Sequence, residues 1–480
     1  MRVSVGSKLL AAPATGAARD ALAAEDDVWI VGGAVRDAIA GREVTDLDLA
    51  VAGEEARLAR RIAEAAGGIA FELSAEFATW RALAPGHDWH VDVTRMRGGG
   101  IEPDLAARDF TANAIAVPLT DPEAAPLDPY GGAADGAAGR LRAVSERSFA
   151  DDPLRILRAA RLGAQLGFEI EPATVRLARE AAPRAGEPAG ERQLAELRML
   201  VAGPDPVRGL GLLDELGATA GVLPELAALH GVEQNPNPHL DVHGHTIEVL
   251  RRLLEVERDL ERYAGDAAPG LRDLLAEPLA DELTRGEALR FGAILHDVGK
   301  PATRRQHDGG FVSFVGHDRE GAALVRAACA RLKASRALSS HLEQLTLHHL
   351  HLGFMASEPP LTRRRLYEYL DLTAPVAADV TVLTVADRLS ARGLGPTASA
   401  EMVEAHLELA REVLPEAIAW HRHGPPRAPI RGDELAAALG IEPGPELGRL
   451  LAEIEAGVFT GEVETPEDAI VLARSVAHPG

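Results

Sequence analysis

The chain has 480 residues, a formal net charge of −23 and a single cysteine, Cys329. This length predicts several domains, and one cysteine leaves no internal disulfide partner, which favours a reducing cytoplasmic location. No apolar run approaches the length of a membrane span, and residues 1–27 lack the pattern of a signal peptide, so no membrane partner is expected.

The acidic balance argues against binding of nucleic acid by the chain as a whole, because phosphate contacts require Lys and Arg. Between Arg140 and Arg208, however, the sequence has twelve arginines and only ten acidic residues. A local basic track is enough to bind RNA, so the acidity of the whole chain does not exclude an RNA partner.

Residues 1–27 are rich in alanine and predict a helical extension. The next segment joins an apolar strand, the pair Gly32-Gly33, a short helix with Arg36, and the acids Asp46 and Asp48. Glycines let backbone N–H groups approach a phosphate at a helix N-terminus. Alternation along a strand places the two aspartates on one face, where their charges repel unless a cation lies between them. This pattern predicts a nucleotide-transfer site, and Mg²⁺ suits its oxygen ligands.

A dinucleotide-binding domain is the competing interpretation of a strand–glycine–helix pattern. The GxGxxG fingerprint is absent, and a further strand, His90-Val91-Asp92-Val93, supplies Asp92 as a third carboxylate. Three carboxylates after a double-glycine turn favour a catalytic metal site over a solvated strand end.

This segment resembles the nucleotidyltransferase fold shared with DNA polymerase beta. More narrowly, it is similar to the class II (bacterial-type) tRNA nucleotidyltransferases and poly(A) polymerases. Three further motifs match this family in order along the chain, namely DLAARDFTANA at 104–114, DPYGG at 128–132 and DDPLRILRAAR at 151–161. The resemblance covers residues 28 to about 470.

The resemblance implies which residues hold the metals and the nucleotide. Asp46 and Asp48 would hold two metal ions, and Asp92 would complete the shell of the first. The residues expected to contact the phosphates and sugar of the nucleotide are Gly32, Gly33, Arg36 and Arg108. Asp109 and Asn113 are expected to support the strand that carries Arg108.

The motif at 151–161 is expected to read the incoming base. Asp152 and Arg155 would present a hydrogen-bonding edge to cytosine or adenine, because Asp offers acceptors and Arg a fixed fork of donors. Arg158 and Arg161 follow at three-residue spacing on the same helix face and would complete the nucleotide pocket.

Two departures from the family pattern affect the predicted reaction. Ala107 stands beside Arg108 where the family often has two arginines, and only VTRMRGGGIEP separates Asp92 from Asp104. Many full CCA-adding members have a longer flexible segment there, linked to the switch from C to A addition, and short versions resemble CC-adding enzymes. The sequence leaves CCA, CC-only, A-only and poly(A) addition open.

A second cluster of His and Asp residues lies on predicted helices between His245 and Asp387. It resembles the HD superfamily of metal-dependent phosphohydrolases, in which a metal-bound water attacks phosphorus. The implied ligands of a first metal are His245, His296, Asp297 and Asp387, and the candidates for a second metal or for phosphate are His317 and His348. Imidazole with carboxylate suits Mg²⁺, Mn²⁺, Ni²⁺ or Zn²⁺.

The predicted fold is α+β and multidomain. It comprises a helical extension (1–27), a polymerase-beta-like nucleotidyltransferase head (28–142), a helical neck and RNA-binding body (143–230), an all-α HD domain (231–395) and a helical tail (396–480).

The predicted function is template-independent addition of C and/or A to the 3′ end of tRNA from CTP and ATP by two-metal catalysis. Mg²⁺ is expected in the head and a second divalent metal in the HD domain. One alternative is a poly(A) polymerase. Others are an HD-domain phosphodiesterase or phosphatase with a head that only positions RNA, or a non-catalytic nucleotide-sensing or RNA-binding protein.

Overall fold

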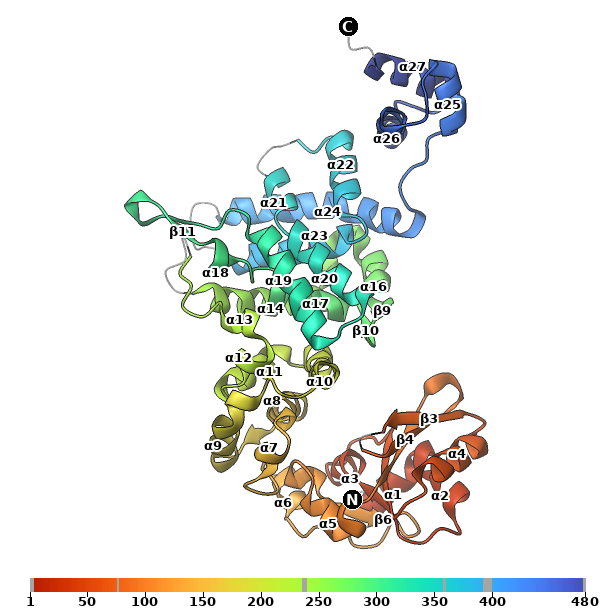
Figure 1. The fold of residues 1–480 in the computed structure, drawn as a ribbon, viewed down its shortest axis with the longest axis vertical. Coiled ribbons are helices and arrows are strands. Elements are labelled where there is room, and N and C mark those ends of the chain that lie inside the picture. The colour runs from red at the N-terminus through yellow and green to blue at the C-terminus, as the bar shows by residue number, and fades with distance from the viewer. Residues whose placement is uncertain (1–3, 76, 235–239, 357–359, 392–398, 478–480) are drawn as a thin grey trace. The chain divides into compact units, whose positions relative to one another are not determined.

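The computed structural model describes residues 4–75, 77–234, 240–356, 360–391 and 399–477. The chain divides into two compact units, 1–222 and 223–480 (Figure 1). The expected boundary between residues 395 and 396 lies outside the described residues.

The first unit is built on a six-stranded mixed sheet with the order β3-β4-β5-β2-β1-β6. Neighbouring strands are antiparallel except for β2 and β5, which run parallel. This parallel pair lies inside the sheet and sets two of the expected catalytic strands side by side. The strands are β1 (Val28–Val31), β2 (Leu47–Val51), β3 (Ile69–Ser74), β4 (Thr79–Leu83), β5 (His90–Arg95) and β6 (Ala116–Pro118).

One apolar core joins the sheet to the helices around it. Leu9 and Leu22 belong to the same core as Ile30 and Leu49, so the predicted N-terminal extension packs as part of the head. The helices of this part are α1 (Val5–Ala11), α2 (Pro13–Leu22), α3 (Gly33–Ile39), α4 (Glu55–Ala66), α5 (Ile101–Ala106) and α6 (Gly132–Ala137).

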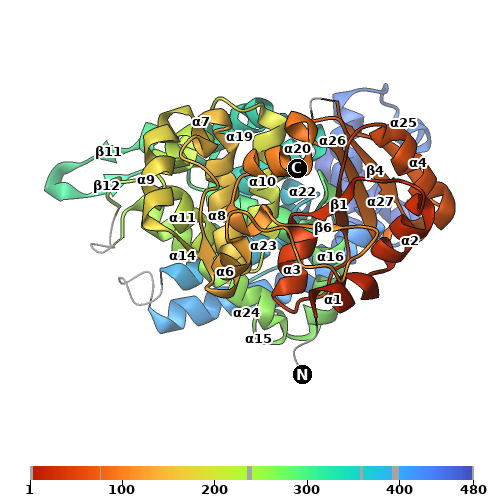
Figure 2. The same cartoon turned by 90° about the horizontal axis from the view of Figure 1, so that it is seen from below.

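A helical body completes the first unit, and its helices can be followed in Figure 2. Apolar residues of α8 recur at three- and four-residue steps, and Leu154, Leu157 and Ala160 are buried. The elements are β7 (Arg140–Leu141), α7 (Ser148–Asp151), α8 (Leu154–Leu166), β8 (Glu169–Ile170), α9 (Pro172–Ala181), α10 (Gly190–Ala202), α11 (Pro206–Glu215) and α12 (Thr219–Val222).

In the part of the second unit that the structure describes, the chain is helical apart from two short two-stranded sheets, β9–β10 and β11–β12. Its elements up to residue 390 are α13 (Pro224–Ala227), α14 (Val242–Arg258), α15 (Leu260–Ala264), α16 (Ala268–Ala276), β9 (Pro278–Ala280), β10 (Leu283–Thr284), α17 (Arg285–Leu295), α18 (Lys300–Thr303), β11 (Arg305–Gln306), β12 (Val312–Ser313), α19 (His317–Leu332), α20 (Arg336–His348), α21 (His351–Ala356), α22 (Arg363–Thr373) and α23 (Ala377–Ser390).

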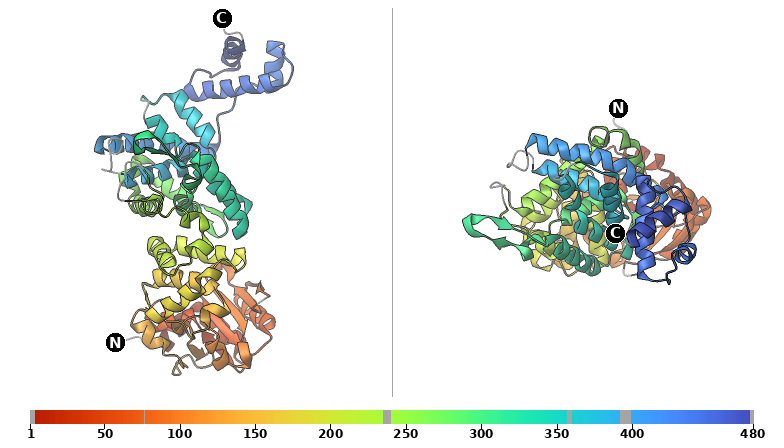
Figure 3. Two further views of the ribbon diagram at one scale, coloured as in Figure 1. Left: turned by 60° about the vertical axis from the view of Figure 1, so that its left-hand side comes forward. Right: turned by 90° about the horizontal axis from the view of Figure 1, so that it is seen from above.

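A long helix and a three-helix group end the second unit (Figure 3). The last three helices enclose a small core of their own around Leu435, Leu450 and Ile454. The helices are α24 (Ala400–His423), α25 (Gly432–Leu439), α26 (Pro445–Thr460) and α27 (Pro466–Ala477).

Among the described residues, no single helix is both long and apolar enough to cross a membrane. Helices α22 and α23 reach the necessary length and apolar composition only when they are taken together, and a bend of 100° separates them.

Candidate active site and metal centre

The predicted carboxylates gather where β2 and β5 run side by side. Asp48 of β2 is the register partner of Asp92 on β5, and Asp46 immediately precedes β2. Leu47 and Leu49 point into the core, so the aspartates between and beside them lie on the opposite, exposed face of β2. The alternation read from the sequence is therefore present in the structure.

Two of the three carboxylates have a cationic or imidazole partner. Arg81 holds Asp92 with two hydrogen bonds of 2.7 and 2.8 Å. Asp46 Oδ1 accepts a hydrogen bond of 3.0 Å from the backbone N–H of His90 and lies 2.8 Å from His90 Nδ1. The side chain of Asp48 makes no hydrogen bond or ion pair with any residue that the structure describes.

The electrostatics of the two aspartates differ accordingly. Solvent still reaches Asp48, yet the protein atoms crowded around it displace part of its hydration, and together with the charge of Asp92 this raises the pKa of Asp48. Partial burial would also raise the pKa of Asp46, but its bonds to His90 lower it. An unpaired carboxylate beside a second carboxylate is a site that fits a divalent cation.

The double-glycine turn touches this carboxylate. Gly32 has φ +70°, and a Cβ there would lie 3.2 Å from Asp48 Oδ2 and 3.1 Å from Arg108 Nη1. A side chain would therefore fill the space between these two groups, which explains the glycine. Arg36 of α3 donates to Asn113 Oδ1 at 2.7 Å and also binds Asp37, so its predicted phosphate contact would compete with these bonds.

The segment after β5 is tied down by a buried carboxylate. Asp104 is 2% exposed and binds Arg97 at 3.0 Å and Arg108 at 2.9 and 3.0 Å. Gly98 has φ +68°, and a Cβ there would lie 2.5 Å from the side chain of Pro103. The short segment is thus a tight turn that fixes Arg108 next to Asp48.

Asp109 is the centre of a buried network that joins the head to α8 and α10. Arg158 donates to Asp109 Oδ2 at 2.8 and 3.0 Å and to Glu196 at 2.8 Å, and Arg161 donates to Glu196 at 2.6 Å. Asn113 also donates to Asp109 at 3.1 Å. Burial alone would raise the pKa of Asp109, but Arg158 and Asn113 hold it well below its ordinary value.

The two expected base-reading residues both have partners. Asp152 accepts a hydrogen bond of 2.7 Å from Arg192 on α10. Arg155 donates to the carbonyl oxygens of Ala107 at 2.6 Å and Arg108 at 3.3 Å, and burial lowers its pKa. Its Nε–H makes no hydrogen bond to the residues that the structure describes. Arg155 therefore supports the 104–114 motif in addition to lining the base pocket.

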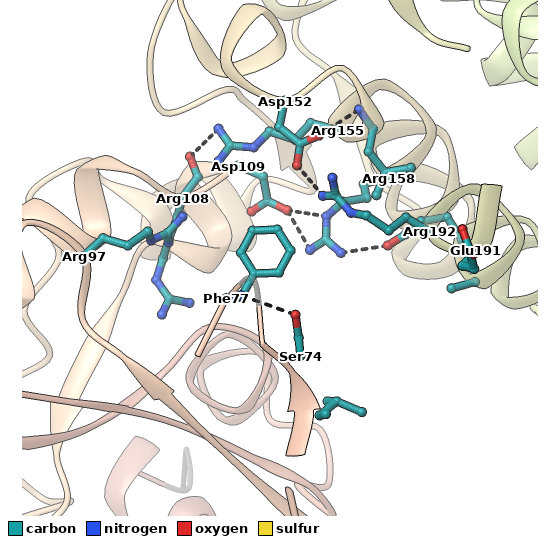
Figure 4. Close-up of a pocket in the computed structure, with 14 residues that line it drawn as sticks. Ser74, Phe77, Arg97, Arg108, Asp109, Asp152, Arg155, Arg158, Glu191 and Arg192 are labelled. Atoms are coloured by element: carbon teal, nitrogen blue, oxygen red, sulfur yellow. Dashed lines mark hydrogen bonds and ion pairs between the residues drawn. The ribbon is translucent and has the colours of Figure 1, made fainter. Parts of the chain in front are cut away.

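Three cavities of about 610, 460 and 220 Å³ join these groups, and Arg108 lines all of them. Asp152 and Arg155 line the first, Asp48 lines the second and third, and Gly32 and Arg36 line the third. Figure 4 shows the first cavity, with Arg97 and Arg108 on one side and Arg158 and Arg192 on the other. Cavities of several hundred Å³ are typical for small ligands.

Several residues of this site were missed by the sequence analysis. These are Phe77, Arg81, His90, Arg97, Arg192 and Glu196. Arg192 and Glu196 are four residues apart on one helix, so this spacing was a signal. The others come from strands and turns whose neighbours are set only by the fold.

The second unit brings together five of its six predicted metal ligands. His245 Nε2 lies 3.4 Å from Asp297 and 3.2 Å from Asp387, and His296 Nε2 lies 3.2 Å from Asp297. His317 Nε2 lies 3.3 Å from the other oxygen of Asp297. Burial would lower the pKa of His245, but bonds with Asp297 and Asp387 raise it to about 9.

The orientation of the imidazole rings fits a metal. His296, His317 and His349 each donate from Nδ1 to a backbone carbonyl three residues earlier, at 2.9, 2.7 and 2.7 Å. In a neutral ring, such a bond leaves the lone pair on Nε2, and buried His296 Nε2 has no hydrogen-bond partner among the described residues. Such backbone bonds orient metal-binding histidines.

His348 differs from the expectation. Its Nε2 is bonded to Gln344 at 3.0 Å, whereas its neighbour His349 lies within the cluster, with Nε2 3.2 Å from His317 Nε2. Successive helical positions point about 100° apart, so only one member of the His348-His349 pair can face Asp297. Asp297, His317 and His349 form a second candidate ligand group beside His245, His296 and Asp297.

Comparisons with known proteins match most of the chain. Residues 28–142 match the Poly A polymerase head domain, 167–229 the "Probable RNA and SrmB- binding site of polymerase A" and 242–392 the HD domain. The A-adding tRNA nucleotidyltransferase of Deinococcus radiodurans is 36% identical over 455 residues, which cover 94% of this chain and 95% of that protein. The CC-adding tRNA nucleotidyltransferase of Thermus thermophilus is 31% identical and covers 92% of each chain.

Solved structures share the fold. A CCA-adding enzyme in apo form I has a TM-score of 0.60 at 20% identity and covers 96% of this chain and 93% of its own. The Thermotoga maritima CCA-adding enzyme complexed with tRNA has a TM-score of 0.58 at 19% identity and covers 99% of each chain. The predicted α+β multidomain fold is confirmed.

The fold and the matched domains define a nucleotidyltransferase with an RNA-binding body and an HD domain. The chain belongs to the class II tRNA nucleotidyltransferase and poly(A) polymerase family, as a tRNA 3′-terminal nucleotidyltransferase of the CCA type. Divalent metals are implied by the head and by the HD domain with its His/Asp cluster.

Proposed function

We propose that this enzyme adds part of the 3′-terminal CCA sequence to tRNA, using CTP or ATP. One observation carries the proposal: three relatives that align over nine-tenths of the chain are named A-adding or CC-adding tRNA nucleotidyltransferases. Two relatives named multifunctional CCA proteins, from Nitrosococcus oceani and Pseudomonas paraeruginosa, align over 67% and 72% of the chain. The short turn between Asp92 and Asp104 favours CC addition, and the 36% identity to an A-adding enzyme favours A addition.

The head residues have distinct tasks in this reaction. Asp46, Asp48 and Asp92 would hold Mg²⁺ ions, which when bound activate a primer 3′-hydroxyl and stabilise the leaving pyrophosphate. Arg108, beside Gly32 and Asp48, binds the phosphates. The 220 Å³ cavity beside Arg108 is also lined by Arg36, Asn113, Arg158 and Arg161. Together with Asp109, these residues keep the wall of that cavity rigid.

Base selection belongs to the first cavity. Asp152 accepts a hydrogen bond from the exocyclic amino group of cytosine or adenine, and the Nε–H of Arg155 faces a hydrogen-bond acceptor on the same edge of the base. Arg192 holds Asp152 in place. Both bases carry this donor–acceptor pair, so one site can serve either nucleotide.

The experiment is incorporation of labelled CTP and ATP into three tRNA transcripts that end before CCA, after one C and after CC. Extension that stops at CC, or ATP incorporation only after CC, supports partial addition and identifies which part. Completion of CCA, or repeated ATP addition to any transcript, contradicts the proposal.

A second candidate activity is metal-dependent phosphohydrolysis in the second unit. It is favoured by the histidine cluster, whose Nε2 atoms converge on Asp297. Hydrolysis of 2′,3′-cyclic nucleotide phosphates that is abolished by chelators and by His296→Ala, but not by Asp48→Ala, would establish it. No hydrolysis with Mg²⁺, Mn²⁺, Ni²⁺ or Zn²⁺ would exclude it for these substrates.

A further inference from the structure

Phe77 lies in the turn between β3 and β4. It is 44% exposed, and its backbone N–H donates to Ser74 Oγ at 3.3 Å, which closes the turn. The ring points into the 610 Å³ cavity (Figure 4) and also lines the 460 Å³ cavity. It is the one aromatic side chain among the described residues that line either cavity.

The Phe77 ring lies between two parts of the site. Asp152 and Arg155 line the first of these cavities, and Asp48 lines the second. Phe77 borders both, so it lies between the side chains proposed to read the base and the carboxylate proposed to hold the metal. The sugar and base of a bound nucleotide would occupy this junction.

The ring is also held in place from the body. The guanidinium carbon of Arg192 lies 5.1 Å from the ring centroid, within the range of a cation–π contact. The same Arg192 donates to Asp152 at 2.7 Å. One arginine therefore positions both an aromatic face and a carboxylate edge at the same cavity, while much of the ring stays open.

We propose that Phe77 is a stacking platform for the base of the incoming nucleotide. This inference rests on the proposed function and assigns the face of the base to Phe77, while Asp152 and Arg155 read its edge. Stacking on an aromatic ring tolerates any base because every base has a π-face. It therefore suits this site whether the enzyme adds C or A.

The test is equilibrium binding of CTP, ATP and inorganic tripolyphosphate to the full-length chain with Mg²⁺. Phe77→Leu keeps an apolar side chain but removes the ring, and we expect it to weaken binding of both nucleotides about tenfold. Tripolyphosphate has no base, so its affinity is expected to be unchanged. Phe77→Tyr keeps a ring and is expected to restore nucleotide binding.

Phe71 provides the matched control. It is an exposed phenylalanine on the same hairpin, 40% exposed on β3, and lines none of the three cavities. Phe71→Leu is expected to leave all three affinities unchanged.

Unchanged CTP and ATP binding in Phe77→Leu overturns the stacking role, as does an equal loss for tripolyphosphate. A rise only in the KM for tRNA also overturns it, because the ring would then contact the primer. If the wild-type chain extends no tRNA but shows the expected binding pattern, the proposed function fails and the stacking role stands. If it extends tRNA without that pattern, only the stacking role fails.

Discussion

Arg192 of α10 donates a 2.7 Å hydrogen bond to Asp152, the residue proposed to recognise the amino group of the incoming base. The two residues are 40 positions apart, and Asp152 lies between α7 and α8. A base-reading carboxylate held by a charged donor is restricted to fewer orientations before the nucleotide arrives, which lowers the entropy lost on binding.

Removal of this donor is expected to impair nucleotide selection. Arg192→Ala leaves Asp152 without its charge-assisted bond, and we expect kcat/KM for CTP or ATP to fall about tenfold. Steady-state incorporation at saturating tRNA measures this loss. Arg57→Ala, which removes a surface charge paired with Glu25 and Glu54, is the control and is expected to change nothing. An equal loss in both variants would contradict the role of Arg192.

Arg158 is expected to matter for stability. Arg158→Leu leaves Asp109 and Glu196 buried without their shared cation, which costs about 3–5 kcal/mol in the free energy of unfolding of the first unit. Arg147→Leu, at an exposed pair with Asp151, is expected to cost less than about 1 kcal/mol. Chemical denaturation of both variants measures the difference, and similar losses would contradict a buried network.

Asp48 is expected to destabilise the metal-free protein at neutral pH. Its pKa is raised above the ordinary value, so ionisation disfavours the folded state, and this cost disappears as the pH falls below the raised value. In the presence of a chelator, Asp48→Asn is expected to raise the unfolding temperature at pH 7, with the gain lost near about pH 4. Scanning calorimetry across this range tests the sign, and a lower unfolding temperature of the variant at pH 7 would contradict it.

The two adjacent histidines of α20 are expected to behave differently toward metals. His349→Ala is expected to weaken Mn²⁺ binding in the second unit at least about tenfold, because its Nε2 faces His317 and Asp297. His348→Ala is the control and is expected to bind normally, since its ring is bonded to Gln344. Titration calorimetry measures Mn²⁺ binding, and an Asp48→Asn background removes the contribution of the metal site in the head. The reverse order of the two variants would overturn the assignment of His349.

Local patterns were enough to predict much of the head. Gly32-Gly33, the alternation of Asp46 and Asp48, and the strand around Asp92 are features of short segments, and each lies where the pattern indicates. The pairing of Asp48 with Asp92 could not be predicted from the sequence, because the parallel register of β2 and β5 is set by the sheet as a whole.

The roles of the arginines could be predicted less well. The spacing of Arg155, Arg158 and Arg161 indicates one helix face, but not that these side chains bind Ala107, Asp109 and Glu196, which come from distant segments. The histidine pair shows a related limit. At the end of a helix a shift of one residue changes the direction of a side chain by about 100°, so the sequence alone could not separate His348 from His349.

The most direct test of the account is nucleotide incorporation into tRNA by Asp48→Asn and His296→Ala, beside the wild-type chain. If the head carries the chemistry, Asp48→Asn incorporates neither CTP nor ATP while retaining its fold, and His296→Ala matches the wild type. Incorporation that survives in Asp48→Asn, or that is lost only in His296→Ala, would contradict the assignment of the reaction to the head carboxylates.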